Sequence, residues 1–138
     1  MSIKILKLSV GKGKHRIHSV AIITADGIIV NLAGGERPHV GAVSISIPRR
    51  SLKDPSKLSA SSSVFTLVGH KDDEIARPFS EKLSKELNQV VVVVAGIHVE
   101  QATNNDIKCL ILNSMQIAEN LVEKLKSIIK PSSNSHGT

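Results

Sequence analysis

Residues 90–98 read VVVVVAGIH, and this stretch decides the fold of the chain. Five consecutive valines have no polar face, so they predict a strand buried on both sides, with a parallel neighbour and a covering helix. Helical periodicity flanks the strand at residues 72–87 and 103–130. In open α/β sheets, ligands bind beyond the carboxyl ends of the strands, so we expect a site directly after His98.

The composition predicts one folded domain over residues 1–130, followed by a disordered tail at 131–138. Hydrophobic residues make up 41% of the chain and the mean hydropathy is +0.05, which suffices for a single core. The net charge of +6 permits an anionic partner: nucleic acid, a membrane surface or a phosphorylated ligand. We do not expect nucleic-acid binding, because the chain has no Trp or Tyr, and Phe65 and Phe79 lie in apolar patterns.

A single cysteine, Cys109, excludes an intramolecular disulfide and fits a reducing compartment. It falls in a helical apolar run, so we expect a buried, unreactive thiol rather than a nucleophile. No window of the sequence reaches the apolar length that a membrane span requires. The sequence therefore predicts a soluble, cytoplasmic protein with no membrane partner.

Five strands are expected before the first helix. They lie at residues 2–10, 19–24, 28–32, 40–47 and 63–68. Short connections, one of them marked by Asp26-Gly27, favour an antiparallel meander, and residues 63–98 are expected to form a right-handed parallel crossover. With the order β-β-β-β-β-α-β-α, the sequence predicts an α+β fold. This fold is a two-layer α/β sandwich in which two helices cover one face of a mixed six-stranded sheet.

Three other segments carry local expectations. Residues 40–47 alternate between an aliphatic face, centred on Ile45, and a face of alanine and serine. The first face is expected to pack, and the second to be wet or covered by small groups. Residues 49–62 are rich in Ser, Lys and Pro and predict a mobile loop. The basic run at residues 12–16 is expected to be mainly a solvated turn.

Each predicted helix has one unusual feature. Pro78 lies inside the first helix, which predicts a kink or a fresh start near Arg77. The second helix begins with a capping-box pattern from Thr103 to Asp106. Its apolar arc is wider than one sheet face needs, through Leu112, Met115 and Ile117. Because exposed apolar area of this kind marks interfaces, we expect a homodimer or a higher homo-oligomer.

Three polar clusters interrupt the apolar patterns: GGERPHVG at residues 34–41, GHKDDE at 69–74 and GIHVEQATNN at 96–105. In a meander, the end of the third strand and the start of the fourth lie at one edge of the sheet. The fifth strand ends at that edge, and a parallel crossover brings the end of the sixth strand there too. All three clusters therefore meet on one rim, which carries the three histidines His39, His70 and His98.

A rim with histidines, glycines and basic residues predicts a pocket for an anionic ligand, with Lys71 and helix N–H groups facing a phosphate. Purely structural roles stay open as alternatives. The glycine pair at 34–35 could simply turn the chain, and the residues at 69–71 could serve just to join a strand to a helix. The candidate binding residues are Gly34, Gly35, Arg37, His39, Gly69, His70, Lys71, Gly96, His98 and Glu100.

At the same clusters, the sequence resembles the small D-subunit family of gallate-type hydroxyarylic acid decarboxylases, whose members are described as chaperones for prenylated flavin. The matching residues are Gly34, Gly35, Glu36, Pro38, His39, Gly41, Ala42 and Val43, then Gly69, His70, Lys71, Asp73 and Glu74, then Gly96, Ile97, His98, Ala102 and Thr103. The resemblance implies prenylated FMN or FMN as a phosphate-bearing cofactor. It also implies a decarboxylase as the partner protein, and a chaperone or accessory subunit without chemistry of its own.

Two other functions remain as alternatives. The predicted fold is similar to that of proteasome assembly chaperones, which favours a protein assembly chaperone or interaction module. A metal-dependent hydrolase would use His39, His70 and His98 as ligands and Glu100 as base, but their spacing matches no zinc signature. An enzyme is therefore less expected than a binding protein.

Overall fold

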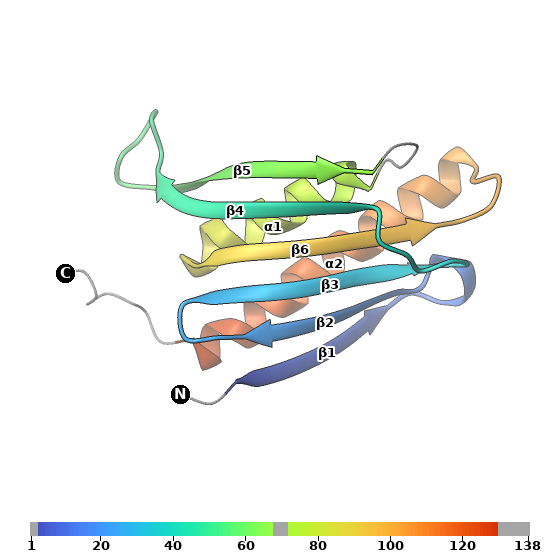
Figure 1. The fold of residues 1–138 in the computed structure, drawn as a ribbon, viewed down its shortest axis with the longest axis horizontal. Coiled ribbons are helices and arrows are strands. Elements are labelled where there is room, and N and C mark those ends of the chain that lie inside the picture. Colours follow the sequence, from blue (N-terminus) through green and yellow to red (C-terminus); the bar gives the residue numbers. More distant parts are fainter. Residues whose placement is uncertain (1–2, 68–71, 130–138) are drawn as a thin grey trace.

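The computed structural model of the protein describes residues 3–67 and 72–129. The strands are β1 (Lys4–Val10), β2 (Ile17–Ile23), β3 (Gly27–Gly35), β4 (Ala42–Arg50), β5 (Leu58–Thr66) and β6 (Val90–His98). A short 3-10 turn, η1 (Gly13–His15), precedes β2, and the helices are α1 (Asp73–Leu87) and α2 (Asn104–Ile128). Both helices lie on the same side of one six-stranded sheet (Figure 1), so the predicted α+β sandwich is confirmed.

The valine strand β6 lies in the middle of the sheet rather than beside β5. The strand order is β1-β2-β3-β6-β4-β5, and β6 pairs in parallel with β3 and antiparallel with β4. β5 and β6 run in the same direction, as predicted, but β4 separates them, and the predicted pairing of β3 with β4 is wrong. The most apolar strand takes a central position because neighbours on both sides satisfy its backbone there. β3 therefore reaches β4 through residues 36–41, which cross the carboxyl end of β6.

The core lies between the sheet and the two helices. α1 packs on β4, β5 and β6, while α2 packs on β1, β2 and α1. In β6, the side chains of Val91, Val93 and Ala95 are fully buried beneath the helices. Val92 and Val94 point to the opposite face, which we call the open face, and are half-buried. The prediction that the valine strand is buried on both sides is therefore wrong for the single chain, because both helices cover the same side.

The serine face of β4, rather than its aliphatic face, packs against a helix. Ser44 and Ser46 are fully buried, and the hydroxyl of each contacts the Ser80 hydroxyl of α1 at 2.7 Å. The Ser62 hydroxyl of β5 lies 2.6 Å from that of Ser46 and extends the chain of contacts. Small side chains let α1 approach β4, and hydrogen bonding offsets the cost of burying the hydroxyls. Ile45 lies on the open face instead, so the expected packing of β4 is reversed.

Half of the segment predicted as a mobile loop is strand. β4 continues to Arg50 and β5 begins at Leu58, which leaves only residues 51–57 for the turn. The two strands pair along this whole length, and Arg49 Nε donates to the Ser61 hydroxyl at 2.7 Å. A serine-rich strand has no apolar periodicity, so its partner strand rather than its own pattern determines its structure.

The helices agree with the sequence only in part. α1 is continuous through Pro78, so the predicted fresh start is wrong. The capping box of α2 is confirmed. Ile117 is fully buried and Met115 is half-buried, so much of the wide apolar arc is used inside the molecule. Cys109, expected to be buried, is half-exposed. In the described part of the chain, no helix is long and apolar enough to cross a membrane.

Candidate functional site

The rim predicted from the strand directions exists. β3 and β6 end there, β4 begins there, and both helices start beside it (Figure 1). The rings of His39 and His98 meet edge to face, with their centroids 6.2 Å apart. The inserted position of β6 does not disturb this result, because it changes the neighbours of the strands but not their directions. Gly69, His70 and Lys71 lie outside the described residues, so their placement stays a prediction.

Residues 36–41 are held across the end of β6 by backbone hydrogen bonds. His39 N donates to Gly96 O at 3.3 Å, and Gly41 N donates to Ala95 O at 2.8 Å. Gly96 is required for this crossing, because a Cβ at that position would lie 1.5 Å from His39 O. Gly34 and Gly35 pair with β6 inside the sheet and do not line the cavity between the helix starts. The predicted glycines therefore build the rim by close backbone packing.

Asp72 holds the rim together, although the sequence suggested only a helix-dipole role for it. Its side chain does not cap α1. Instead, the buried carboxylate accepts a hydrogen bond from Ile97 N at 2.9 Å and contacts His39 Nε2 at 3.0 Å. A Cβ at Gly41 would lie 1.8 Å from Asp72 Oδ2, so this position needs glycine. The acidic residue at the start of α1 thus joins β6 to the crossing segment.

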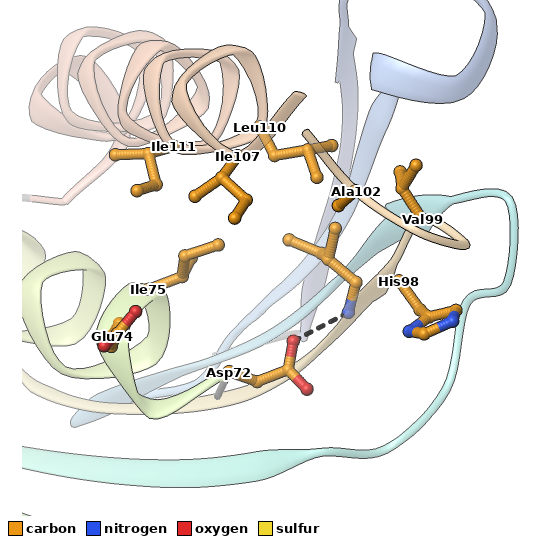
Figure 2. A pocket seen from close by; sticks show the side chains of 10 residues that line it. Asp72, Glu74, Ile75, His98, Val99, Ala102, Ile107, Leu110 and Ile111 are labelled. Atoms are coloured by element: carbon orange, nitrogen blue, oxygen red, sulfur yellow. Dashed lines mark hydrogen bonds between the residues drawn. The ribbon is translucent and has the colours of Figure 1, made fainter. Parts of the chain in front are cut away.

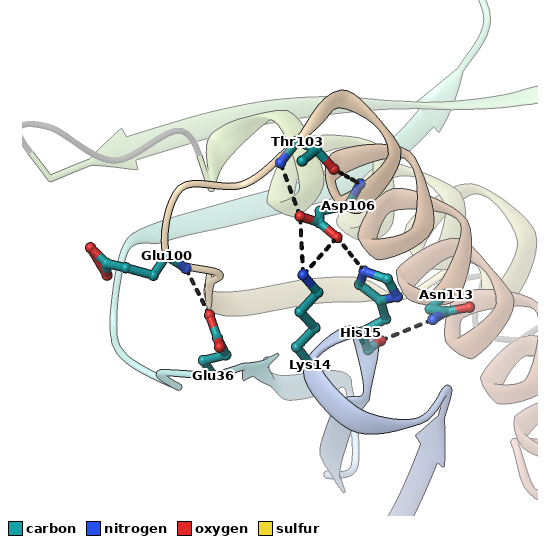
Figure 3. Close-up of polar contacts among 7 residues, drawn as sticks. All are labelled: Lys14, His15, Glu36, Glu100, Thr103, Asp106 and Asn113. Atoms are coloured by element: carbon teal, nitrogen blue, oxygen red, sulfur yellow. Dashed lines mark hydrogen bonds and ion pairs between the residues drawn. The ribbon is translucent and has the colours of Figure 1, made fainter.

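His39 bridges two oxygen acceptors. Its Nδ1 lies 3.1 Å from Arg37 O and its Nε2 lies 3.0 Å from Asp72 Oδ2, so a ring N–H on either side has an oxygen acceptor. His98, next to it, is more exposed and its Nε2 contacts Glu100 Oε2 at 2.9 Å. The backbone N–H of Glu100 donates to Glu36 Oε1 at 2.8 Å (Figure 3). The histidines are thus positioned by carboxylates.

Carboxylates are prominent on the described rim. They belong to Glu36, Asp72, Glu74 and Glu100, whereas Arg37, in the crossing segment, is exposed. The predicted Lys71 lies outside the described residues, so the pocket for an anionic ligand stays a prediction. A phosphate is expected near Arg37 rather than among these carboxylates.

A cavity of about 270 Å³ opens beside the rim, between the starts of the two helices and the end of β6 (Figure 2). It is lined by Asp72, Glu74, Ile75, Ile97, His98, Val99, Ala102, Ile107, Leu110 and Ile111. Most of this lining is aliphatic, and among the predicted site residues that the structure describes, His98 reaches it. Sequence reasoning missed the cavity because Ile75, Leu110 and their neighbours have the helical spacing of ordinary core residues.

A second polar cluster lies at the start of α2, where the basic turn was expected to be solvated (Figure 3). His15 Nε2 lies 2.7 Å from Asp106 Oδ1, and Lys14 Nζ lies 3.3 Å from the same oxygen. The pKa of Asp106 is held well below its usual range, first by the hydrogen bond from Thr103 N and then by His15. Asn113 also donates to His15 O at 2.9 Å. The turn is therefore tied to α2 rather than free in solvent.

Within residues 3–67 and 72–129, no group of three or more His, Cys, Asp or Glu side chains is placed to hold a metal ion. The hydrolase hypothesis also needs His70, which lies outside these ranges. What remains on the described rim is a pair of histidines fixed by carboxylates, next to an aliphatic cavity. Such a combination can hold a ligand that has both an apolar and a polar end.

Comparison with known proteins adds a family and a fold. A family model described as the prenylated flavin chaperone LpdD-like domain matches residues 11–126. A similar solved structure is the crystal structure of a novel chaperone complex for yeast 20S proteasome assembly. It has a TM-score of 0.60 and 16% sequence identity, and the match covers 94% of this chain and 100% of that one. At this identity, the likeness concerns the fold alone. No curated protein matches the sequence.

Proposed function

This chain belongs to the prenylated flavin chaperone LpdD-like domain family, and we propose that it binds prenylated FMN or FMN and delivers it to a decarboxylase. In this role the protein is an accessory chaperone without chemistry of its own, acting in the cytoplasm. The observation that carries the proposal is the position of the aliphatic cavity and the histidine rim, both of which lie within the matched residues 11–126.

The polar end of the cofactor is proposed to lie along the rim. Arg37 is exposed there. Gly69, His70 and Lys71 follow β5 in the sequence, and β5 ends at the same edge of the sheet. His39, His98 and Glu100 line the rim, while Gly34, Gly35 and Gly96 let the backbone segments pack closely behind it. Charge-assisted hydrogen bonds from Arg and Lys to phosphate are among the stronger polar contacts in proteins.

Titration of FMN and prenylated FMN into the purified protein, followed by flavin fluorescence, tests the proposal. Arg37→Ala and Lys71→Ala should each weaken binding by roughly tenfold to a hundredfold, because each removes one charge-assisted contact. Lys57→Ala is the matched control: Lys57 is an exposed lysine in the 51–57 turn, at the other end of β4 and β5. Equal affinity in all three variants, or no binding by the parent protein, would contradict the proposed function.

The open face favours a second function, pairing with another protein chain, and we propose a second copy of this chain as that partner. The strand register places Ile5, Ile22, Ile29, Val92 and Ile45 in one row across five neighbouring strands. Ile5, Ile29 and Ile45 are 64%, 42% and 41% exposed. The row contains no charged residue, so two copies can pack these faces together as aligned sheets do.

Light scattering at micromolar concentration tests this pairing and separates it from pairing through α2. The parent protein should be a dimer. Ile45→Lys, in the middle of the row, should give a monomer because it places an unpaired charge in the interface. Leu112→Lys, at a more exposed aliphatic position on α2, should leave the dimer intact. A monomeric parent protein, or dissociation by Leu112→Lys alone, contradicts pairing through the open face.

A further inference from the structure

The aliphatic cavity has the wrong charge for a phosphate. Two of its lining residues, Asp72 and Glu74, are acidic, and both belong to the start of α1. The Asp72 carboxylate is already hydrogen-bonded by Ile97 N, and it lies at the base of the cavity as drawn in Figure 2. An anionic group inside this space would face like charges. The phosphate of a flavin cofactor must therefore stay outside the cavity.

The aliphatic part of the cavity suits a branched hydrocarbon. Ile75 of α1 faces Ile107 and Ile111 of α2 across the opening, while Val99 and Ala102 close the side next to His98 (Figure 2). Ile107 and Ile111 are 45% and 37% exposed, so water contacts apolar surface that a ligand could cover. These side chains offer apolar contact over most of the wall.

The volume of the cavity is large enough for part of a flavin cofactor but not for all of it. Sites that enclose a complete drug-sized ligand usually measure about 300–1,000 Å³, and a cavity of about 150 Å³ holds one benzene. At about 270 Å³, this cavity can take a prenyl-derived group together with the adjoining edge of a ring, but not an entire flavin nucleotide.

We propose that this cavity receives the prenyl-derived hydrocarbon part of the cofactor, with the phosphate outside it, so that the protein distinguishes prenylated FMN from FMN. This inference rests on the proposed function and adds the orientation of the ligand and the source of its selectivity. Because several buried carbons are gained, prenylated FMN should bind about tenfold or more tightly than FMN.

The test compares both cofactors on the parent protein and on two variants of α2. Ile111→Glu adds a charge to the cavity opening and should weaken the binding of prenylated FMN by more than that of FMN, so that the preference for prenylated FMN is lost. Leu112→Glu alters the neighbouring residue, which does not line the cavity, and should keep the preference. Circular dichroism melting checks that both variants fold. A preference that survives in a folded Ile111→Glu variant overturns the inference.

Methyl NMR of isoleucine-labelled parent protein gives a second readout that needs no variant. Prenylated FMN should shift the methyl signals of Ile75, Ile107 and Ile111, and FMN should leave them nearly unchanged. If prenylated FMN binds but shifts only open-face signals such as those of Ile29 and Ile45, the orientation is wrong while the proposed function stands. If neither cofactor binds, the proposed function fails and the inference fails with it.

Discussion

Both helices begin beside an aspartate that contacts a histidine from a distant segment, yet the two carboxylates have different uses. Asp106 completes the capping box of its own helix and also contacts His15, at 2.7 Å. The Asp72 side chain does not cap α1 and contacts Ile97 N and His39 instead. The first pair ties a turn to a helix, which is a structural role. The second lies on the wall of the cavity and fixes the histidine rim. The same two residue types thus serve the fold at one helix and shape the candidate site at the other.

Gly41→Ala should disturb the contacts of Asp72 and have the largest effect on stability. The added Cβ would lie 1.8 Å from Asp72 Oδ2, and this carboxylate is held on both sides. We expect a loss of about 3 kcal/mol in the free energy of unfolding, measured by urea denaturation. Gly13→Ala, in η1 on the Asp106 side, is the control. There the Cβ meets open space at a φ of +58°, so the cost should be about 1 kcal/mol. Equal losses in the two variants would contradict the close packing at Asp72.

A smaller effect is expected at Asp106, and it depends on pH. Because the pKa of Asp106 is depressed in the folded state, its stabilisation is present above the ordinary aspartate pKa and is lost as pH falls through the folded value. Asp106→Asn should therefore melt at a lower temperature than the parent at neutral pH. Its melting temperature should also decline less steeply between about pH 5 and pH 2. Parallel declines in the two proteins would show that the carboxylate is not the source of the pH dependence.

The contrast between the two helix starts also explains what the sequence could reveal. The capping box is a local pattern, so Thr103 and Asp106 were predicted correctly. The rim was predicted because strand directions follow from short connections and a crossover, and these directions survive the insertion of β6 between β3 and β4. The role of Asp72 depends on a hydrogen bond to Ile97, twenty-five positions along the chain, and no local pattern encodes such a contact.

Packing partners were the other limit of sequence reasoning. The serine face of β4 was expected to be wet or covered by small groups, and the matching Ser80 on α1 makes its burial under a helix possible. The cavity was not foreseeable, because an aliphatic residue such as Ile107 has the same helical spacing whether it fills a core or lines an opening. The valine strand was predicted to be buried on both sides. A second copy of the chain packed on the open face would bury the side that the helices do not cover.

The central claim is that Asp72 organises a ligand site whereas Asp106 maintains the fold. Its most direct test is the dissociation constant for prenylated FMN in Asp72→Asn and Asp106→Asn, measured side by side on folded protein. Asparagine can still accept from Ile97 N but loses the charge next to His39, so Asp72→Asn should weaken binding about tenfold or more. Asp106→Asn should bind as the parent protein does. Unchanged binding in Asp72→Asn, or an equal loss in both variants, would contradict the claim.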